Sequence, residues 1–486
     1  MRSLFFSFVF FMIGSMLPAA VDVFPPLPEK MHESDLYEVF VQQEGKTHSS
    51  YVYKSVNDSK MNRRPMMTQS NNWTAFAFDG KVSVIIKMKK GKIEKATIRP
   101  LSRKISCEIV DDSVRLTLDH PENLLVEIKG QERNPLFLFP VKIDKNHPTA
   151  ETADTHYFGP GIHQIDEFVM KKPNLYLAGG AYVKGNIRFD KSLQKKKVKI
   201  GGPGILSGID YSHEMEAWDN HQMIKERSGK MDIEISDITL TDASGANIMI
   251  WSKLFANNIK ILAWASCSDG IGGGKNSVIR GCFLKTMDDN IHITRDGTKV
   301  YDTVHYLEAH GSAFVMGWSV NHDTTDVYIN GVDLIGDIDT FRNPAYPPKE
   351  QHYNHAIFTL NNMKGTPEGE GIHYHHLVAE NVRSEIKNRM TIAIQIKNHF
   401  SMKLPDGSIE TYNEGLGHVS DLVFRNFTIM EKPLCRSVFD GNGDKDGSVK
   451  NITFENYRIE GELLTEENAD KYIIRKGKTS DFHYKP

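Results

Sequence analysis

The sequence has few of the features that mark several large classes of protein. Its 486 residues include only four cysteines, Cys107, Cys267, Cys282 and Cys435, so a disulfide framework does not hold the chain together and no zinc-type spacing occurs. Cys267 and Cys282 could pair or pack as thiols, and we favour buried thiols. The 59 basic and 62 acidic residues give a net charge of -3 without a long basic run, which argues against a nucleic-acid surface.

Long apolar runs are missing except at the N-terminus. The stretch "MRSLFFSFVFFMIGSMLPAA" has one Arg, an apolar run from Leu4 to Leu17 and then small residues, which is the layout of a cleaved secretory signal. A membrane anchor is the alternative, but the run is short for a bilayer span. We therefore expect a signal peptide over residues 1–20 and a secreted or periplasmic protein with no membrane span after cleavage.

An amphipathic helical period is also lacking. Between about residues 30 and 143, short runs such as "KVSVIIKM", "SVRLTLDH" and "NLLVEIKG" alternate apolar and polar residues, which indicates antiparallel strands with one wet face. The sequence predicts an N-terminal β-sandwich domain over 21–145. The polar stretch "DKNHPTAETADTH" that follows is typical of a linker.

From residue 156 to 486 a different pattern recurs at irregular intervals. Each copy has apolar residues at alternate positions, a polar or Asn/Gly corner and a second short strand, as in "MDIEISDITL", "TDVYINGVDLI" and "VKNITFENYRI". Repeated units of this kind form solenoids, and the absence of helical periodicity favours a parallel β-helix. The longer intervals fit two coils or one coil with a large loop. We take the following residues as equivalent strand starts: Ile233, Ile259, Val278, Val327, Ile372, Leu422 and Ile452.

Three aspartates stand out in "CSDGIGGGKNSVIRGCFLKTMDDNIHI". Asp269 precedes Asp288 by 19 residues, close to one coil, and stacked strands are about 4.8 Å apart, so Asp269, Asp288 and Asp289 are expected on one patch at the entrance of their strands. Hydrolysis of a glycosidic bond needs a protonated acid and a carboxylate, and crowded carboxylates keep one acid protonated. Ordinary turn chemistry explains either motif alone, but the pair one coil apart favours catalysis.

This stretch, followed by "SAFVMGWSVNHDTTDVYINGVDLI" and "HAIFTLNNM", resembles glycoside hydrolase family 49, the dextranase and isopullulanase group. The resemblance implies an all-β fold, with an N-terminal β-sandwich followed by a right-handed parallel β-helix, and hydrolysis of α-glucans with inversion. It also implies that Asp288 is the proton donor and that Asp269 and Asp289 hold the water. For inversion, the acid and base carboxyl groups should lie roughly 6.5 to 9.5 Å apart.

The chain departs from the family at two places, with Met287 where the family usually has a third Asp and His292 where it has a Lys. The related polygalacturonase family 28 shares the aspartate layout but adds a Gly-His-Gly turn and an Arg-Ile-Lys triplet that grips uronate. This chain has "VMGWSVN" and "IQIKN" there, with Gln395 in place of the Arg. We therefore expect a neutral α-glucan substrate; the alternatives are a polygalacturonase-like pectin hydrolase and a non-catalytic glycan-binding β-helix.

The expected partners are a polysaccharide or oligosaccharide, with no nucleic acid, and the oligomeric state is left open. Trp318 is the first candidate for an aromatic floor under the sugar, although it could be structural, and His292 and Lys397 are the candidate polar contacts. No cofactor or metal is expected. The stretch "DGNGDKDGS" over 440–448 resembles a calcium loop but lacks the closing Glu.

Overall fold

The computed structural model describes most of the chain after the N-terminal segment. The described ranges are 20–57, 68–213, 221–265, 267–308, 311–316, 322–336, 356–362, 372–386, 390–396, 400–403, 409–412, 417–441 and 447–486. Within these ranges the regular elements are β-strands and short 3-10 helices, with no α-helix, and no helix long and apolar enough for a membrane span is found there. The predicted signal segment lies outside the described residues, apart from Ala20.

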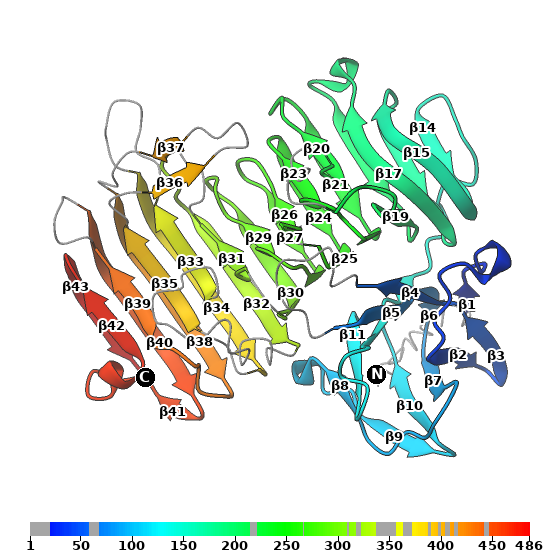
Figure 1. The fold of residues 1–486 in the computed structure, drawn as a ribbon, viewed down its shortest axis with the longest axis horizontal. Helices are drawn as coiled ribbons and strands as arrows, with labels where there is room; N and C mark the ends of the chain where they lie inside the picture. The colour runs from blue at the N-terminus through cyan, green and yellow to red at the C-terminus, as the bar shows by residue number, and fades with distance from the viewer. Residues whose placement is uncertain are drawn as a thin grey trace, which may run out of the picture.

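The N-terminal part is a sandwich of two five-stranded sheets with a smaller three-stranded sheet beside them (Figure 1). In strand order, the first sheet contains β3 (Lys46–Ser50), β2 (Tyr37–Gln43), β7 (Val82–Met88), β10 (Ser113–Leu118) and β9 (Cys107–Val110). The second contains β4 (Val52–Val56), β5 (Ser70–Thr74), β12 (Leu136–Leu138), β11 (Leu124–Ile128) and β8 (Ala96–Arg99). The third contains β1 (Ala20–Val23), β6 (Phe76–Asp79) and β13 (Val141–Lys142).

Period-two patterning produces these strands. In β7, Val82, Val84 and Ile86 point into the sandwich core and are at most 1% exposed, while the residues between them face outward. The strand pairs antiparallel with β2 and β10 in an unbroken register. The apolar residues that alternate with polar ones in the sequence therefore form the inner face of the sheet.

The remainder of the described chain forms a parallel β-helix with three faces. The first face contains β14 (Thr155–Phe158), β16 (Asn174–Leu177), β18 (Lys197–Gly201), β21 (Asp232–Ser236), β24 (Lys253–Asn257) and β27 (Val278–Arg280). The second face contains β15 (Gly161–Met170), β17 (Ala181–Phe189), β19 (Ile205–Ser207), β22 (Thr239–Thr241), β25 (Lys260–Leu262) and β28 (Phe283–Lys285). Both faces continue in the longer strands β30 (Lys299–Tyr306), β32 (Val327–Ile335), β34 (His373–Ser384), β38 (His418–Ile429) and β40 (Ser448–Ile459), and β43 (Thr479–Lys485) follows β40.

We call the third face the site face. It contains β20 (Ile224–Glu226), β23 (Ile248–Ile250), β26 (Ile271–Gly272), β29 (Ile291–His292), β31 (Phe314–Val315), β33 (Ala356–Asn362), β35 (Met390–Ile396), β39 (Ser437–Asp440) and β42 (Ile473–Lys476). Outside the parallel pattern, β41 (Glu462–Leu463) pairs antiparallel with β40, and β36 (Phe400–Lys403) and β37 (Ile409–Tyr412) form a hairpin.

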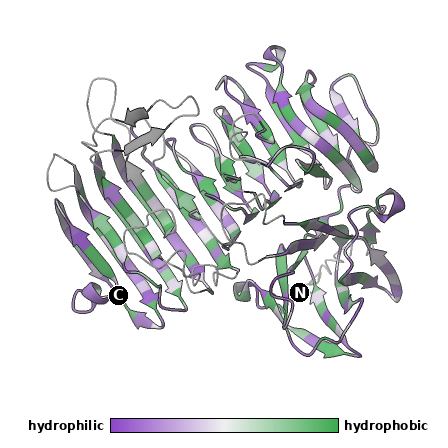
Figure 2. Ribbon diagram, viewed as in Figure 1, coloured by the Kyte–Doolittle hydropathy of each residue, from purple (hydrophilic) through white to green (hydrophobic). Residues whose placement is uncertain are grey.

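Apolar residues stack along the inside of the β-helix, coil upon coil. On the site face, five fully buried side chains are in register from coil to coil: Ile248, Ile271, Ile291, Phe314 and Phe358. In Figure 2, green hydrophobic segments recur from coil to coil along the β-helix. Burial of this continuous apolar column is the main stabilising contribution to the solenoid. The fold predicted from the sequence, a β-sandwich followed by a right-handed parallel β-helix, is confirmed.

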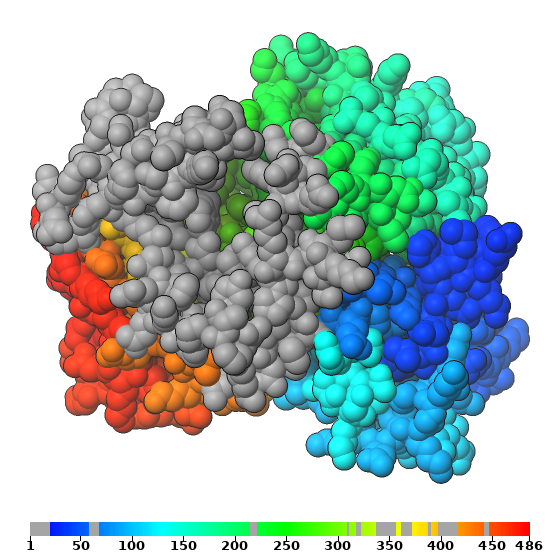
Figure 3. Space-filling view, viewed as in Figure 1, coloured from blue at the N-terminus to red at the C-terminus, as the bar shows by residue number. Residues whose placement is uncertain are grey.

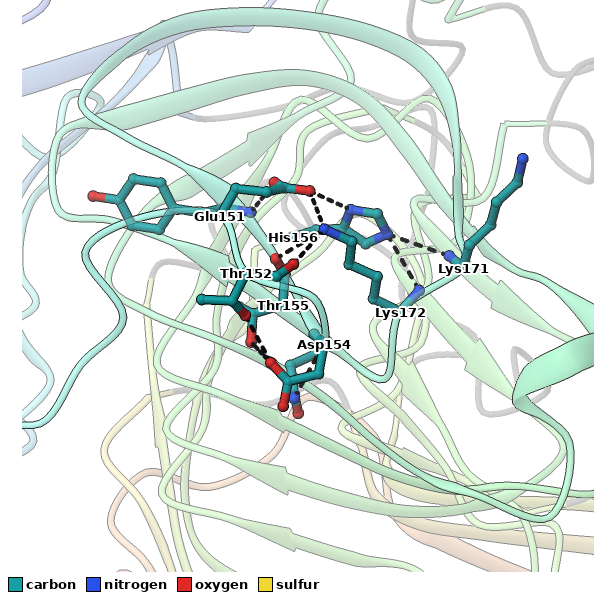
Figure 4. A network of polar contacts seen from close by, with 9 residues as sticks. Glu151, Thr152, Asp154, Thr155, His156, Lys171 and Lys172 are labelled. Atoms are coloured by element: carbon teal, nitrogen blue, oxygen red, sulfur yellow. Dashed lines mark hydrogen bonds and ion pairs between the residues drawn. The ribbon is translucent and has the colours of Figure 1, made fainter.

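A polar network closes the first coil of the β-helix, where no preceding coil covers the strand edge (Figure 4). Glu151 forms an ion pair with Lys172, and its carboxylate lies 3.4 Å from Nδ1 of His156. His156 Nε2 accepts hydrogen bonds from the backbone N–H groups of Lys171 and Lys172, both at 3.3 Å. Burial lowers the pKa of His156, and Lys172 adds to this, which keeps Nε2 unprotonated and able to accept. The network satisfies backbone groups that an open edge would leave unpaired.

The sandwich packs against the second face of the β-helix. Phe137 of β12 contacts Phe283 of β28 and Tyr306 of β30, with ring centroids 5.2 and 5.7 Å apart. These rings belong to one buried apolar cluster that joins the two parts. Figure 3 shows the blue and cyan sandwich against the green coils of the β-helix.

Buried charges cross the same interface. The ammonium group of Lys285 lies 2.6 Å from Glu308, and both side chains are fully buried. Glu308 also accepts a hydrogen bond from the backbone N–H of Thr68 in the sandwich. Arg99 of the sandwich similarly pairs with the buried carboxylate of Glu385 at 2.9 Å. These contacts fix the position of the sandwich because a buried charge that loses its partner is costly.

Two expectations need comment. Ile259 is not equivalent to Ile233, because Ile233 pairs with Leu254 on the first face, whereas Ile259 leads into β25 on the second. The short corner between the two strands of one coil makes the two starts look alike. Val278 is also one residue out of register with Ile233, because it pairs with Phe255, the partner of Glu234. Leu377, and not Ile372, pairs with Val327 and Leu422. The structure forms no disulfide between Cys267 and Cys282, both of which it describes; Cys282 is buried and Cys267 is half-buried.

Candidate active site

The three aspartates lie in turns that lead into neighbouring strands of the site face. Asp269 comes two residues before β26, and Asp289, which follows Asp288, likewise comes two residues before β29. The two coils are joined here by the backbone, since the N–H of Gly270 donates to the carbonyl of Asp289 at 2.8 Å. The structure thus places all three at the entrance of their strands, one coil apart, as the spacing predicts.

Two glycines allow this close approach of backbones. A Cβ on Gly270 would lie 2.1 Å from the carbonyl oxygen of Asn290 in the next coil. Gly311, in the coil after that, has a φ of +88°, and its Cβ would lie 2.2 Å from the carbonyl carbon of Asp288. Any side chain at either position would displace the turns that carry the aspartates.

The carboxyl groups of Asp269 and Asp289 face each other across the coils. Their nearest oxygens, together with a ring nitrogen of His292, all lie within 4.8 Å of one another. Burial and the neighbouring charge of Asp288 raise the pKa of Asp269. Burial, followed by the charges of Asp288 and Asp269, raises the pKa of Asp289 well above the ordinary range. The site therefore retains protons on carboxyl groups at pH values at which an exposed aspartate is ionised.

His292 supplies a positive charge to this cluster. Its Nε2 lies 3.0 Å from Oδ1 of Asp269. Burial alone would lower the pKa of His292, but the hydrogen bond to Asp269 and the charges of Asp289 and Asp288 outweigh it and raise the pKa. His292 therefore provides a cation at the position where family 49 usually has a Lys, and this departure from the family preserves the charge.

Asp289 is fixed from the coil above it. Its Oδ1 accepts the backbone N–H of Ser312 at 2.7 Å, and the hydroxyl group of Ser312 is 2.6 Å from that of Thr359 in the following coil. The carboxyl group is only 4% exposed. Stacked coils thus hold this side chain in one orientation toward Asp269.

A buried polar network that the sequence does not reveal supports the turn itself. Asn290 donates to the hydroxyl group of Thr286, which in turn donates to the carbonyl of Asp288 at 2.6 Å. His305 lies 2.9 Å from Oδ1 of Asn290 and 3.0 Å from the hydroxyl group of Thr303. Burial lowers the pKa of His305 to about 3, so the ring is neutral and donates from Nδ1 to the amide oxygen. The contacts within the turn are local, and the register of the coils brings His305 to Asn290.

Met287 takes no part in the open site. It is fully buried against Trp264 and Ala265. The indole N–H of Trp264 donates to Asp242 at 2.7 Å, and Asp242 also accepts from Ser55 of the sandwich. The residue that replaces the family's third Asp therefore belongs to the packing that links the acidic turn to the sandwich.

Other predicted contacts fall on different parts of the chain. Trp318, Lys397 and the calcium-like loop at 442–446 lie outside the described residues. Gln395 is described in β35 and is 4% exposed, so its side chain does not present a polar group to solvent.

The carboxylates and His292 could also act as metal ligands by their chemistry. Among the described residues, Asp269, Asp289 and His292 form the one group of three whose ligand atoms are close enough together. A cation there would require His292 to lose its proton and its bond to Asp269, which the raised pKa opposes. The expectation of no metal remains a prediction.

Comparison with known proteins shows similarity along nearly the whole chain. A dextranase from Arthrobacter sp. (strain CB-8) is 20% identical over 549 residues, covering 92% of this chain and 82% of that protein. An isopullulanase from Aspergillus niger is 21% identical over 519 residues, covering 92% and 89%. The structure of Dex49A from Penicillium minioluteum has the same fold, with a TM-score of 0.70, 18% identity and 92% coverage of each chain. No family model matches the chain. The chain is thus a glycoside hydrolase that resembles the dextranase and isopullulanase group, family 49, as its motifs predict.

Proposed function

We propose that the protein is a secreted hydrolase that cleaves α-glycosidic bonds of a neutral glucan of the dextran or pullulan type, with inversion at the anomeric carbon. The observation that carries this proposal is the cluster of Asp269, Asp289 and His292 within 4.8 Å, with Asp288 beside it. The relatives named dextranase and isopullulanase point to the same substrate class.

The proposed reaction assigns a separate role to each carboxyl group. Asp288 donates its proton to the glycosidic oxygen as the bond to the anomeric carbon breaks. Asp269 and Asp289 hold a water molecule between them, since one water can bond to two oxygens separated by less than twice a hydrogen-bond length of about 2.8 Å. Because crowding raises the pKa of both carboxyl groups, the pair shares one proton, and the ionised member removes the proton of the water as it attacks the opposite face of the sugar. His292 stabilises the negative charge on Asp269.

A neutral substrate fits the charges of the site better than a uronate. A polyuronate chain carries one carboxylate per sugar, and a cleft that binds it needs bidentate Arg or several Lys. The Arg of the uronate-gripping triplet is replaced by Gln395, which is buried.

The test measures release of reducing ends from dextran, pullulan and polygalacturonate by the purified mature protein. We expect hydrolysis of an α-glucan that changes little between low and moderate ionic strength. Asp288→Asn and Asp269→Asn should each lower kcat by about 10²- to 10⁴-fold, the usual worth of a general acid or base. Asp470→Asn, at a side chain that is 90% exposed and far along the chain, is the control. Hydrolysis of polygalacturonate alone would refute the substrate assignment, and full activity in Asp288→Asn would refute the roles.

A further inference from the structure

Trp251 is the exposed tryptophan among those that the structure describes. Trp73 and Trp264 are 1% and 5% exposed, whereas 52% of the Trp251 surface is open. Trp251 directly follows β23, where Ile248 and Ile250 point into the core, so alternation directs Trp251 outward from the site face. The same face carries Asp269, Asp289 and His292.

The indole ring is held in place rather than left free in solvent. The guanidinium group of Arg227 lies over the ring, 5.0 Å from its centroid, and Arg227 is itself bonded to Gln222 at 3.0 Å. The buried Glu226 fixes the backbone on both sides, because its carbonyl accepts the N–H of Trp251 and its carboxylate accepts that of Ser252. A ring ordered before binding loses little entropy when a ligand covers it.

The path from this ring to the acids has a glycine where a side chain could block it. Gly272 lies in register between Met249 and His292, in the coil that separates Trp251 from β29. A Cβ there would lie 2.8 Å from Sδ of Met249 and 3.5 Å from Cβ of His292, so it would point into the space between the two side chains. Gly272, within the glycine-rich turn "GIGGGK", thus leaves the site face without a side chain that would rise between Trp251 and the acids.

The distance suits a sugar beyond the bond that is cleaved. Trp251 lies two coils from His292, at about 4.8 Å per coil, and two residues further along the strand, at about 3.3 Å per residue, which gives about 12 Å between the two Cα atoms. A ligand that spans this distance is longer than one sugar ring.

We propose that Trp251, backed by Arg227, is a sugar-binding subsite for the glucan chain, remote from the cleaved bond. The apolar face of a neutral pyranose ring packs on the indole surface that Arg227 does not cover. The inference rests on the proposed function, since it assigns a position along the same substrate. It predicts that Trp251 contributes only when the chain is long enough to reach it.

The test compares Trp251→Ala with the unchanged mature protein on dextran- and pullulan-derived oligosaccharides of increasing length. We expect kcat/KM to fall about tenfold on long chains, as the loss of one stacking contact implies, and to stay unchanged on the shortest cleaved oligosaccharide. Trp251→Phe should keep most of the activity. Phe255→Ala is the matched control, because Phe255 is 39% exposed on the first face.

The outcomes separate the subsite from the proposed function. Equal activity of Trp251→Ala at every chain length, or an equal loss on short and long chains, overturns the subsite while hydrolysis itself stands. Binding of α-glucans to the unchanged protein is measured by the quenching of tryptophan fluorescence. If the unchanged protein neither binds nor cleaves any α-glucan, the proposed function is overturned, and the subsite with it.

Discussion

The ion pair between Lys285 and Glu308 provides a sharp test of how the sandwich is attached. Both side chains are fully buried, 2.6 Å apart, and Lys285 also lies over the ring of Tyr306 at 5.3 Å. Lys285→Met keeps the length of the side chain and removes the charge. It leaves the carboxylate of Glu308 buried with the N–H of Thr68 as its neutral partner.

The expected loss of stability follows from the buried charge of Glu308, which no longer has the ammonium group of Lys285 beside it. Removing one partner of a buried ion pair costs about 3 to 5 kcal/mol, because the other charge remains out of water. The double variant Lys285→Met/Glu308→Leu removes both charges and leaves the N–H of Thr68 without this acceptor, at a cost of about 1 to 3 kcal/mol. We therefore expect the double variant to be more stable than Lys285→Met by about 2 kcal/mol.

Urea titration followed by circular dichroism measures these differences as shifts of the midpoint at constant slope. Lys275→Met is the control, since Lys275 is 67% exposed and pairs with Asp296 at the surface, and its midpoint should barely move. A cost below about 1 kcal/mol for Lys285→Met, or a double variant as unstable as the sum of the single changes, would refute the reasoning.

Other predictions concern the site. Gly270→Ala should lower activity in the reducing-end assay by about 10²-fold, because its Cβ would lie 2.1 Å from a backbone oxygen and displace the aspartates. Gly159→Ala is the control and should be active in the same assay, because the nearest atom to its Cβ is a ring carbon of Tyr157 at 3.3 Å. His292→Lys should extend activity to higher pH, because Lys keeps its charge where His292 loses its proton, and a pH profile of kcat/KM that is unchanged would contradict this. Asp289→Asn should be inactive yet more stable at pH 7. The raised folded-state pKa of Asp289 destabilises the native protein, and this cost is absent below the unfolded pKa of about 3.9, grows as the pH rises from there toward the folded pKa, and is complete above the folded pKa. Thermal melts at pH 7 and below pH 4 check the difference, and equal gains at both would contradict it. Incubation with EDTA should leave activity unchanged, and a loss restored by a divalent cation would show that Asp269, Asp289 and His292 hold a metal.

The sequence was sufficient for the fold and for the position of the acids because both depend on local periodicity. Alternation in β7 predicted the sandwich core, and the 19-residue step predicted that Asp269 and Asp289 meet on adjacent coils. The register of the coils was harder to read, as the misplaced Ile259 shows, because both strands of one coil have the same apolar pattern.

The surroundings of the acids could not be read in the same way. His305 meets Asn290 only through stacking of coils, and Ser312 reaches Asp289 from 23 residues away. Lys285 is buried because the sandwich covers the second face. Contacts between coils and between domains carry no signal in the local pattern.

The most direct test of the central claim is proton NMR of the first product released from an α-glucan by the mature protein. If Asp288 donates the proton while Asp269 and Asp289 direct water to the opposite face, the first product is the β-anomer, and the α-anomer appears only later by mutarotation. Initial release of the α-anomer would show retention and contradict the assigned roles.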